Sequence, residues 1–293
     1  MIDVRQLVVK TDEQRIVDGV SCTFGKERMI GIIGPNGAGK STLLGAISGY
    51  LPYHTGEVLL DGKRIESYSR KALAKRVAVL QQGGLPGTMF TVREVVEMAR
   101  YPFQNWLGDE TGDAGQVIGH ALQVMGLEQL AERRLDQLSG GERQRVALAK
   151  VLAQQPEIIM LDEPTTYLDI GYQVQLLDVV RDWQRLEGMT VIAVLHDLNL
   201  AAQYCDSLIV MNKGRIIRSG SPDEVLTAEM IREVYGAEAV ITPHPVTGCP
   251  QLLLQPGRSA QQATGDKQRD FEPRSKMALC KEEKDERIRI AGK

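Results

Sequence analysis

The sequence predicts an α/β fold in which a mostly parallel sheet is covered by helices. Two patterns in the chain of 293 residues predict it. Short apolar runs alternate with segments of helical periodicity along most of the chain. One apolar run, 28–34, leads directly through a glycine-rich turn into a helical segment at 40–48. This alternation favours parallel strands, because each pair of parallel strands needs a long crossover connection.

The N-terminal third of the chain is predicted to be rich in strands. Short apolar runs separated by turns indicate strands at 4–10, 16–24 and 28–34. The dipeptide Asp61-Gly62 predicts a hairpin over 56–65, since both residues tolerate the positive φ of a two-residue turn. A short helix is then predicted over 70–76, and a buried strand over 77–82.

The segment 82–138 is predicted to be helical. Thr91 is placed to cap a helix over 91–101, because a glutamate three residues later completes a capping box. Residues 115–133 have the same periodicity and predict a second helix. The stretch 102–115 between them is rich in Gly and Asp and predicts a loop.

Strands and helices alternate again through the C-terminal half of the chain. Helices are predicted within 137–152, 173–186 and 198–205, strands within 157–164 and 189–197, and a hairpin over 207–220. From about Arg258 the chain is charged and poor in large apolar residues, which predicts a disordered or weakly docked tail.

The bulk composition excludes several classes of protein. The net charge of −3 and the even spread of lysines and arginines predict no nucleic-acid partner. Four scattered cysteines without a CxxC pair favour a reduced, intracellular location. No apolar run approaches the roughly 20 residues that cross a bilayer, and the N-terminus lacks the apolar core of a signal peptide. Any link to a membrane is therefore expected to go through another protein.

A glycine-rich motif follows the predicted strand 28–34. The sequence GPNGAGKST matches G-x-x-x-x-G-K-[ST], in which glycines let successive backbone N–H groups point at phosphate oxygens. Lys40 supplies a cation for the terminal phosphates, and the Ser41 hydroxyl is suited to bind Mg²⁺. The motif predicts a P-loop NTPase that binds a nucleoside triphosphate. The predicted binding residues are Gly34, Pro35, Asn36, Gly37, Ala38, Gly39, Lys40, Ser41 and Thr42.

Polar residues end two further apolar runs. In EIIMLDEP, Asp162 is suited to hold Mg²⁺ through water, and Glu163 to polarise an attacking water as a general base. The alternative is that both only cap the next helix. In VIAVLHD, His196 reaches the sheet edge where the ends of parallel strands bind ligands. It is placed there to donate a hydrogen bond to a γ-phosphate oxygen, and the alternative is a structural histidine.

A second phosphate-binding pattern is LSGGERQR at 138–145. Ser139 precedes Gly140 and Gly141 at the start of a predicted helix, which is typical of a helix N-terminus that binds an anion. One chain thus carries two phosphate-binding elements, far apart in the sequence.

With GPNGAGKST, LSGGERQR, IIMLDEP and VLHD in this order, the chain resembles the ATPase subunit of ABC transporters over about residues 2–255. The resemblance implies an ABC ATPase core with a mostly parallel sheet, an N-terminal antiparallel β part and a helical subdomain at about 83–150. It implies one ATP-binding domain over 1–255, with 256–293 as a charged tail outside it. ATP and Mg²⁺ are the expected cofactors.

In this family two subunits face each other head to tail, and each nucleotide lies between the phosphate loop of one and the LSGGE helix of the other. The resemblance therefore implies that Ser139, Gly140 and Gly141 bind the ATP held by a second copy. Asp169, in TTYLDI, matches the loop that contacts the facing subunit, and His196 matches the switch histidine of the family.

The resemblance also implies membrane partners. Gln82, at the end of VAVLQQ, resembles the glutamine that senses Mg²⁺ and couples the ATPase to its membrane subunit, and Gln81 is the adjacent alternative. The expected partners are a second copy, transmembrane permease subunits and, indirectly, an extracytoplasmic substrate-binding protein. The expected location is peripheral, on the cytoplasmic face of the cell membrane.

Two positions depart from the family pattern. Thr11 stands where the family often stacks an aromatic side chain on adenine, and the loss of that contact removes about 1 kcal/mol. Tyr167 replaces a small or polar residue before Leu-Asp. Tight selectivity for adenine is therefore not expected from base stacking, although phosphate contacts should still dominate binding.

Residues 219–241 and 244–254 resemble the importer branch that serves uptake of iron–siderophore complexes, haem and cobalamin. Zinc or manganese importers are the nearest alternative. A soluble ABC ATPase that acts on chromosomes or ribosomes is a rival, but the segment 82–138 is compact and the chain has one phosphate loop. A metabolic kinase is a third reading, and LSGGERQR together with Glu163 disfavours it.

Overall fold

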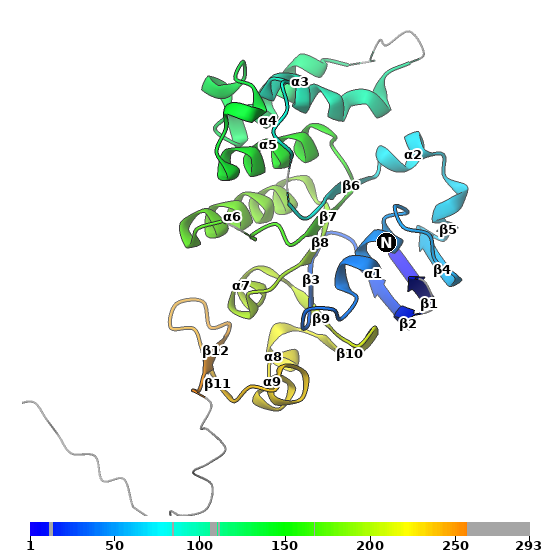
Figure 1. Cartoon of the computed structure of the whole chain (residues 1–293), viewed down its shortest axis with the longest axis vertical. Helices are drawn as coiled ribbons and strands as arrows, with labels where there is room; N and C mark the ends of the chain where they lie inside the picture. The colour runs from blue at the N-terminus through cyan, green and yellow to red at the C-terminus, as the bar shows by residue number, and fades with distance from the viewer. Residues whose placement is uncertain (12–13, 84, 106–109, 111, 167, 257–293) are drawn as a thin grey trace, which may run out of the picture. The chain divides into compact units, whose positions relative to one another are not determined.

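The computed structural model describes residues 1–11, 14–83, 85–105, 110, 112–166 and 168–256. A six-stranded sheet lies at the centre, with strand order β10-β9-β3-β8-β7-β6 (Figure 1). Its strands are β3 Met29–Ile33, β6 Val77–Leu80, β7 Ile158–Asp162, β8 Thr190–Val194, β9 Ser207–Asn212 and β10 Arg215–Gly220. Every neighbouring pair is parallel except β9–β10. The prediction of a mostly parallel sheet is confirmed.

A separate antiparallel sheet forms from the N-terminal part of the chain, in the order β2-β1-β4-β5. Its strands are β1 Ile2–Thr11, β2 Gln14–Phe24, β4 Thr55–Leu60 and β5 Lys63–Arg64. The turn between β4 and β5 has positive φ at Asp61 (48°) and at Gly62 (80°). These values match a two-residue hairpin turn, so the predicted hairpin is confirmed.

Helices cover both sides of the central sheet. They are α1 Lys40–Ile47, α2 Arg70–Ala74, α3 Val92–Glu97, α4 Ala114–Val124, α5 Gly140–Ala153, α6 Ile170–Glu187, α7 Leu198–Tyr204, α8 Pro222–Val225 and α9 Ala228–Tyr235. A hairpin of β11 Ala239–Pro243 and β12 Pro250–Leu254 ends the described chain. Helices α3, α4 and α5 pack against one another and form the helical group near β6 (Figure 1). Among the described residues, no helix combines the length and apolar composition needed to cross a membrane.

Two predicted helices are shorter than expected. The helix predicted over 91–101 ends at Glu97, and a 3-10 segment continues to Phe103 around Pro102, which has no N–H to donate. The helix predicted over 115–133 ends at Val124.

Gly126 ends that second helix. Its φ of 61° is left-handed, and the following N–H of Leu127 bonds to the carbonyl of Leu122 at 2.8 Å. This is the glycine stop of a helix C-terminus. The loop predicted at 102–115 falls partly on 106–109 and 111, which lie outside the described residues.

The middle strands of the central sheet, β3, β7 and β8, are buried on both faces. On β8, Val191 and Ala193 belong to the hydrophobic cluster formed with helices α3 to α9, whereas Ile192 and Val194 belong to the cluster formed with α1 and the antiparallel sheet. This alternation follows from the two-residue period of a strand. Because both faces of these strands are covered, a ligand can approach them at the edge of the sheet where β3, β7 and β8 end.

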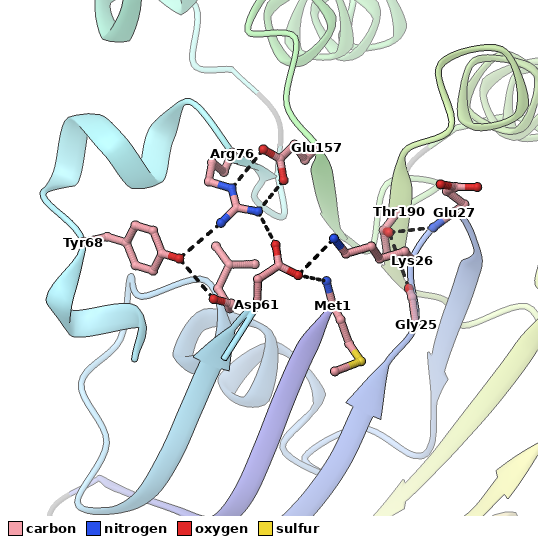
Figure 2. A network of polar contacts seen from close by, with 10 residues as sticks. Met1, Gly25, Lys26, Glu27, Asp61, Tyr68, Arg76, Glu157 and Thr190 are labelled. Carbon is pink, nitrogen blue, oxygen red and sulfur yellow. Dashed lines mark hydrogen bonds and ion pairs between the residues drawn. The ribbon is translucent and has the colours of Figure 1, made fainter. Parts of the chain in front are cut away.

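An ion-pair network joins the antiparallel sheet to the central sheet (Figure 2). Asp61, in the β4–β5 turn, contacts Arg76 at 2.5 Å, and Arg76 in turn contacts Glu157 just before β7 at 2.5 Å. Lys26 and the amino group of Met1 also contact Asp61, at 3.1 and 2.9 Å. The Arg76 guanidinium, followed by the amino group, holds the pKa of the Asp61 carboxyl well below its usual range.

We expect Asp61→Asn to lower the free energy of unfolding by about 1 kcal/mol at neutral pH, because the ion pairs are partly exposed. Asparagine is equally suited to this turn, so the hairpin should remain. Since folding lowers the pKa of Asp61, its stabilisation is present above the unfolded-state pKa of about 3.9 and is lost as the pH falls through the folded-state value. Urea unfolding at several pH values should show the two proteins converging in acid. A difference that does not change with pH would contradict this assignment.

Candidate active site

The loop between β3 and α1 needs glycine for steric reasons. Gly34, Gly37 and Gly39 have φ values of 147°, 77° and 93°. A Cβ on Gly34 would lie 2.1 Å from the carbonyl oxygen of Met211, and one on Gly39 would lie 2.6 Å from that of Ile16. Each distance is far below van der Waals contact. The backbone itself therefore forms the cradle that the motif predicts.

Lys40 is held at the mouth of this loop and is only 5% exposed. Its ammonium donates to the carbonyl oxygens of Gly34 and Pro35, both at 2.9 Å. Burial lowers the pKa of Lys40, while the charges of Glu163 and Asp162 raise it. Two backbone carbonyls thus hold the charged side chain beside the loop.

Ser41 and Asp162 meet at the ends of α1 and β7. The Ser41 hydroxyl donates to a carboxylate oxygen of Asp162 at 2.8 Å. Burial raises the pKa of Asp162, and the bond from Ser41 lowers it. A hydroxyl and a carboxylate side by side are oxygen ligands of the kind that Mg²⁺ prefers, so the two residues fit this ion.

Glu163 follows Asp162 with a left-handed φ of 51°, which turns its side chain out of the strand direction. One carboxylate oxygen lies 2.5 Å from Nε2 of His196, which follows β8. The other oxygen accepts a hydrogen bond from the Gln82 side chain, also at 2.5 Å. Three predicted residues from distant parts of the chain therefore meet at one carboxylate.

These groups line one cavity of about 620 Å³. It contains residues 36–42 of the loop together with Gln82, Glu163 and His196, and adds Ile16 and Thr166. Gly34 and Pro35 lie behind it, where their carbonyls hold the lysine. The first phosphate-binding element and the candidate catalytic residues thus form a single site.

The LSGGE segment lies elsewhere, in a second hollow of about 290 Å³ that includes Ser139, Gly141 and Asp169. Ser139 caps α5: its hydroxyl accepts the N–H of Glu142 at 3.3 Å, and the Glu142 carboxylate accepts the N–H of Ser139 at 2.8 Å. The Ser139 hydroxyl also donates to this carboxylate at 2.7 Å, and this bond, followed by the one from the Ser139 N–H, lowers the pKa of Glu142. Among the described residues, the lining of this hollow shares none with the cavity of about 620 Å³.

A model of the family described as "ABC transporter" matches residues 17–166, which contain the phosphate loop, the LSGGE segment and Glu163. The chain belongs to this family.

Curated relatives extend the similarity over most of this ABC cassette. It is 41% identical over 262 residues to the cobalamin import ATP-binding protein BtuD of Halobacterium salinarum, which covers 89% of the chain and 65% of that relative. It is 39% identical over 255 residues to the ferric enterobactin transport ATP-binding protein FepC of Escherichia coli, covering 87% of the chain and 94% of that relative. The chain thus spans less than two thirds of the first relative and nearly all of the second.

Solved structures agree with the fold of this ABC cassette. The ATP-binding cassette MJ0796, solved as a dimer in a post-hydrolysis state bound to ADP and Pi, matches with a TM-score of 0.67 at 26% identity. The match covers 75% of this chain and 98% of that one. The prediction of an ABC ATPase fold is confirmed.

Sequence reasoning missed two residues of the cavity. Ile16 lies on β2 beside the phosphate loop, and Thr166 donates from its hydroxyl to Glu163 at 3.4 Å. No local pattern marks Ile16, because its place depends on the packing of β2 against the loop. Thr11, which stands where the family often has an aromatic side chain, is exposed and pairs with Gln14 in the hairpin. Tyr167 lies outside the described residues.

Proposed function

We propose that this ABC cassette binds and hydrolyses ATP as a subunit of an importer for an iron complex (siderophore or haem) or cobalamin. Separate transmembrane permease subunits would carry the cargo, and an extracytoplasmic substrate-binding protein would deliver it. The relatives named for cobalamin import and ferric enterobactin transport support this class of cargo. The cassette would lie at the cytoplasmic face of the membrane.

The observation that carries the proposal is the unexplained space around Gly140 and Gly141. A Cβ on either residue would meet nothing within 4 Å, and neither has a left-handed backbone. Both glycines stand in the first turn of α5, so this open space lies at the N-terminus of the helix. An ATP phosphate approaching from a second copy would need this space. Each site then combines the phosphate loop of one copy with α5 of the other.

The residues of the cavity suit the chemistry of γ-phosphate hydrolysis. Lys40 and the loop N–H groups would bind the β- and γ-phosphates of ATP. Ser41 and Asp162, with Gln82 beside them, would hold Mg²⁺, which when bound neutralises charge on the phosphate oxygens. Glu163 would accept a proton from the attacking water.

His196 and Gln82 both contact Glu163, so they orient the base. His196 would also donate to a γ-phosphate oxygen, as its place on the cavity wall allows. Asp169, in the second hollow, would contact the facing copy.

The route to the permease is proposed to start near Gln82. Met89 and Phe90, a few residues after it, are large apolar side chains that are 75% and 51% exposed. Exposed apolar side chains at such a position suit a protein partner. Closure of two copies around ATP would then move the permease through this surface, and release of phosphate would reopen the pair.

The two-copy site is tested with mixed dimers of Lys40→Ala and Gly140→Asp copies. An acidic residue at a helix N-terminus is favourable for folding, whereas its charge repels phosphate. If each site joins two copies, a Lys40→Ala copy paired with a Gly140→Asp copy keeps one intact site. A double-variant copy paired with a wild-type copy keeps none.

ATP hydrolysis by tag-selected dimers distinguishes the arrangements. Hydrolysis by the first pair and its loss in the second support the proposal. The reverse pattern contradicts it, because it places both halves of a site in one chain. The transport role is tested separately: the tagged chain should co-purify with a polytopic membrane protein from solubilised membranes, and recovery with ribosomes or nucleic acid instead would overturn it.

A further inference from the structure

The C-terminal segment 228–254, which contains α9 and the β11–β12 hairpin, contacts α7, the helix that follows His196. This contact takes no part in the proposed chemistry.

The contact is made by Asn199 on α7. Its side-chain carbonyl accepts the N–H of Leu252 at 2.7 Å, and its amide donates to the carbonyl of the same residue at 3.3 Å. Asn199 thus pairs with β12 as a neighbouring strand would. This two-way contact fixes the hairpin to α7 (Figure 1).

Helix α7 begins directly after His196. Asp197 caps it, accepting the N–H groups of Asn199 and Leu200 at 2.8 and 3.0 Å. A rotation of α7 therefore moves the backbone that carries His196. Since the His196 ring lies 2.5 Å from Glu163, such a movement would reach the proposed base.

We propose that segment 228–254 braces the nucleotide site, with Asn199 positioning His196 through α7. The inference rests on the proposed ATPase function for its kinetic test.

Asn199→Ala frees α7 from the hairpin. The expected result is a kcat that falls about fivefold with KM within about twofold, because the base and its histidine lose their orientation. Asn199→Asp keeps the acceptor for Leu252 and should fall between wild type and Asn199→Ala. Gln251→Ala is the control within β12, since its side chain donates to the neighbouring Pro250 carbonyl.

A readout independent of hydrolysis is the NMR signal of the His196 imidazole in ¹⁵N-histidine-labelled, ATP-free protein. Asn199→Ala should shift it, and Gln251→Ala should not. If kcat of Asn199→Ala stays within about twofold of wild type, if its KM changes together with kcat, or if the His196 signal does not move, the brace is wrong. A wild-type protein that does not hydrolyse ATP would overturn the proposed function, while the NMR result would still decide the brace.

Discussion

Glu163→Gln is expected to lower kcat for ATP hydrolysis by at least about 100-fold while ATP binding persists. The amide has the shape of the carboxylate, so it fills the same space beside Gln82 and His196, but it does not accept a proton from water. Two copies should therefore bind ATP, close and remain closed. Phosphate release at saturating ATP measures the loss of turnover, and sedimentation measures the trapped dimer.

The matched control is Glu157→Gln. Glu157 precedes the same strand, β7, at the end opposite the site, where it pairs with Arg76. This variant should hydrolyse ATP at a rate close to that of wild type. Near-normal turnover of the Glu163→Gln protein would show that Glu163 is not the base. Its role would then be limited to its contacts with Gln82 and His196.

Lys40→Ala should weaken ATP binding by about 10- to 100-fold, since a charge-assisted contact with the β- and γ-phosphates is lost. The carbonyl oxygens of Gly34 and Pro35 also lose their donor, so the loop itself becomes less fixed. Equilibrium dialysis with labelled ATP measures the affinity, and circular dichroism checks the fold.

Lys75→Ala is the comparison for Lys40→Ala, because Lys75 is an exposed lysine that lies over the Phe103 ring at 5.2 Å. Its removal should leave ATP affinity unchanged. Tight ATP binding by Lys40→Ala would show that the phosphates do not bind in the loop between β3 and α1.

Local features of the fold were predictable from the sequence because their causes are local. The Asp61-Gly62 turn needs two residues with positive φ, and the phosphate loop needs glycines at fixed places. The end of α4 was predicted wrongly, although its cause is also local. Gly126 is a glycine stop within the run 115–133, and hydrophobic periodicity alone extended the helix past it.

The assembled site was only partly predictable. The strand pattern placed Asp162 and His196 at one sheet edge, since parallel strands end together. Hydrogen bonds between residues far apart in the sequence, such as Gln82 with Glu163, depend on the order of the strands. The motifs do not encode that order, and they give no sign that Ile16 enters the cavity.

The position of β3 in the sheet has a mechanical consequence. Backbone pairs join it to β8 on one side and to β9 on the other, and both partners run in its own direction. A strand that is hydrogen-bonded along both edges deforms little. Its amide hydrogens should therefore be among the slowest in the molecule to exchange with solvent. The strand that leads into the phosphate loop would therefore stay nearly still when the nucleotide binds. The motion that closes the two copies would come from elements farther from β3.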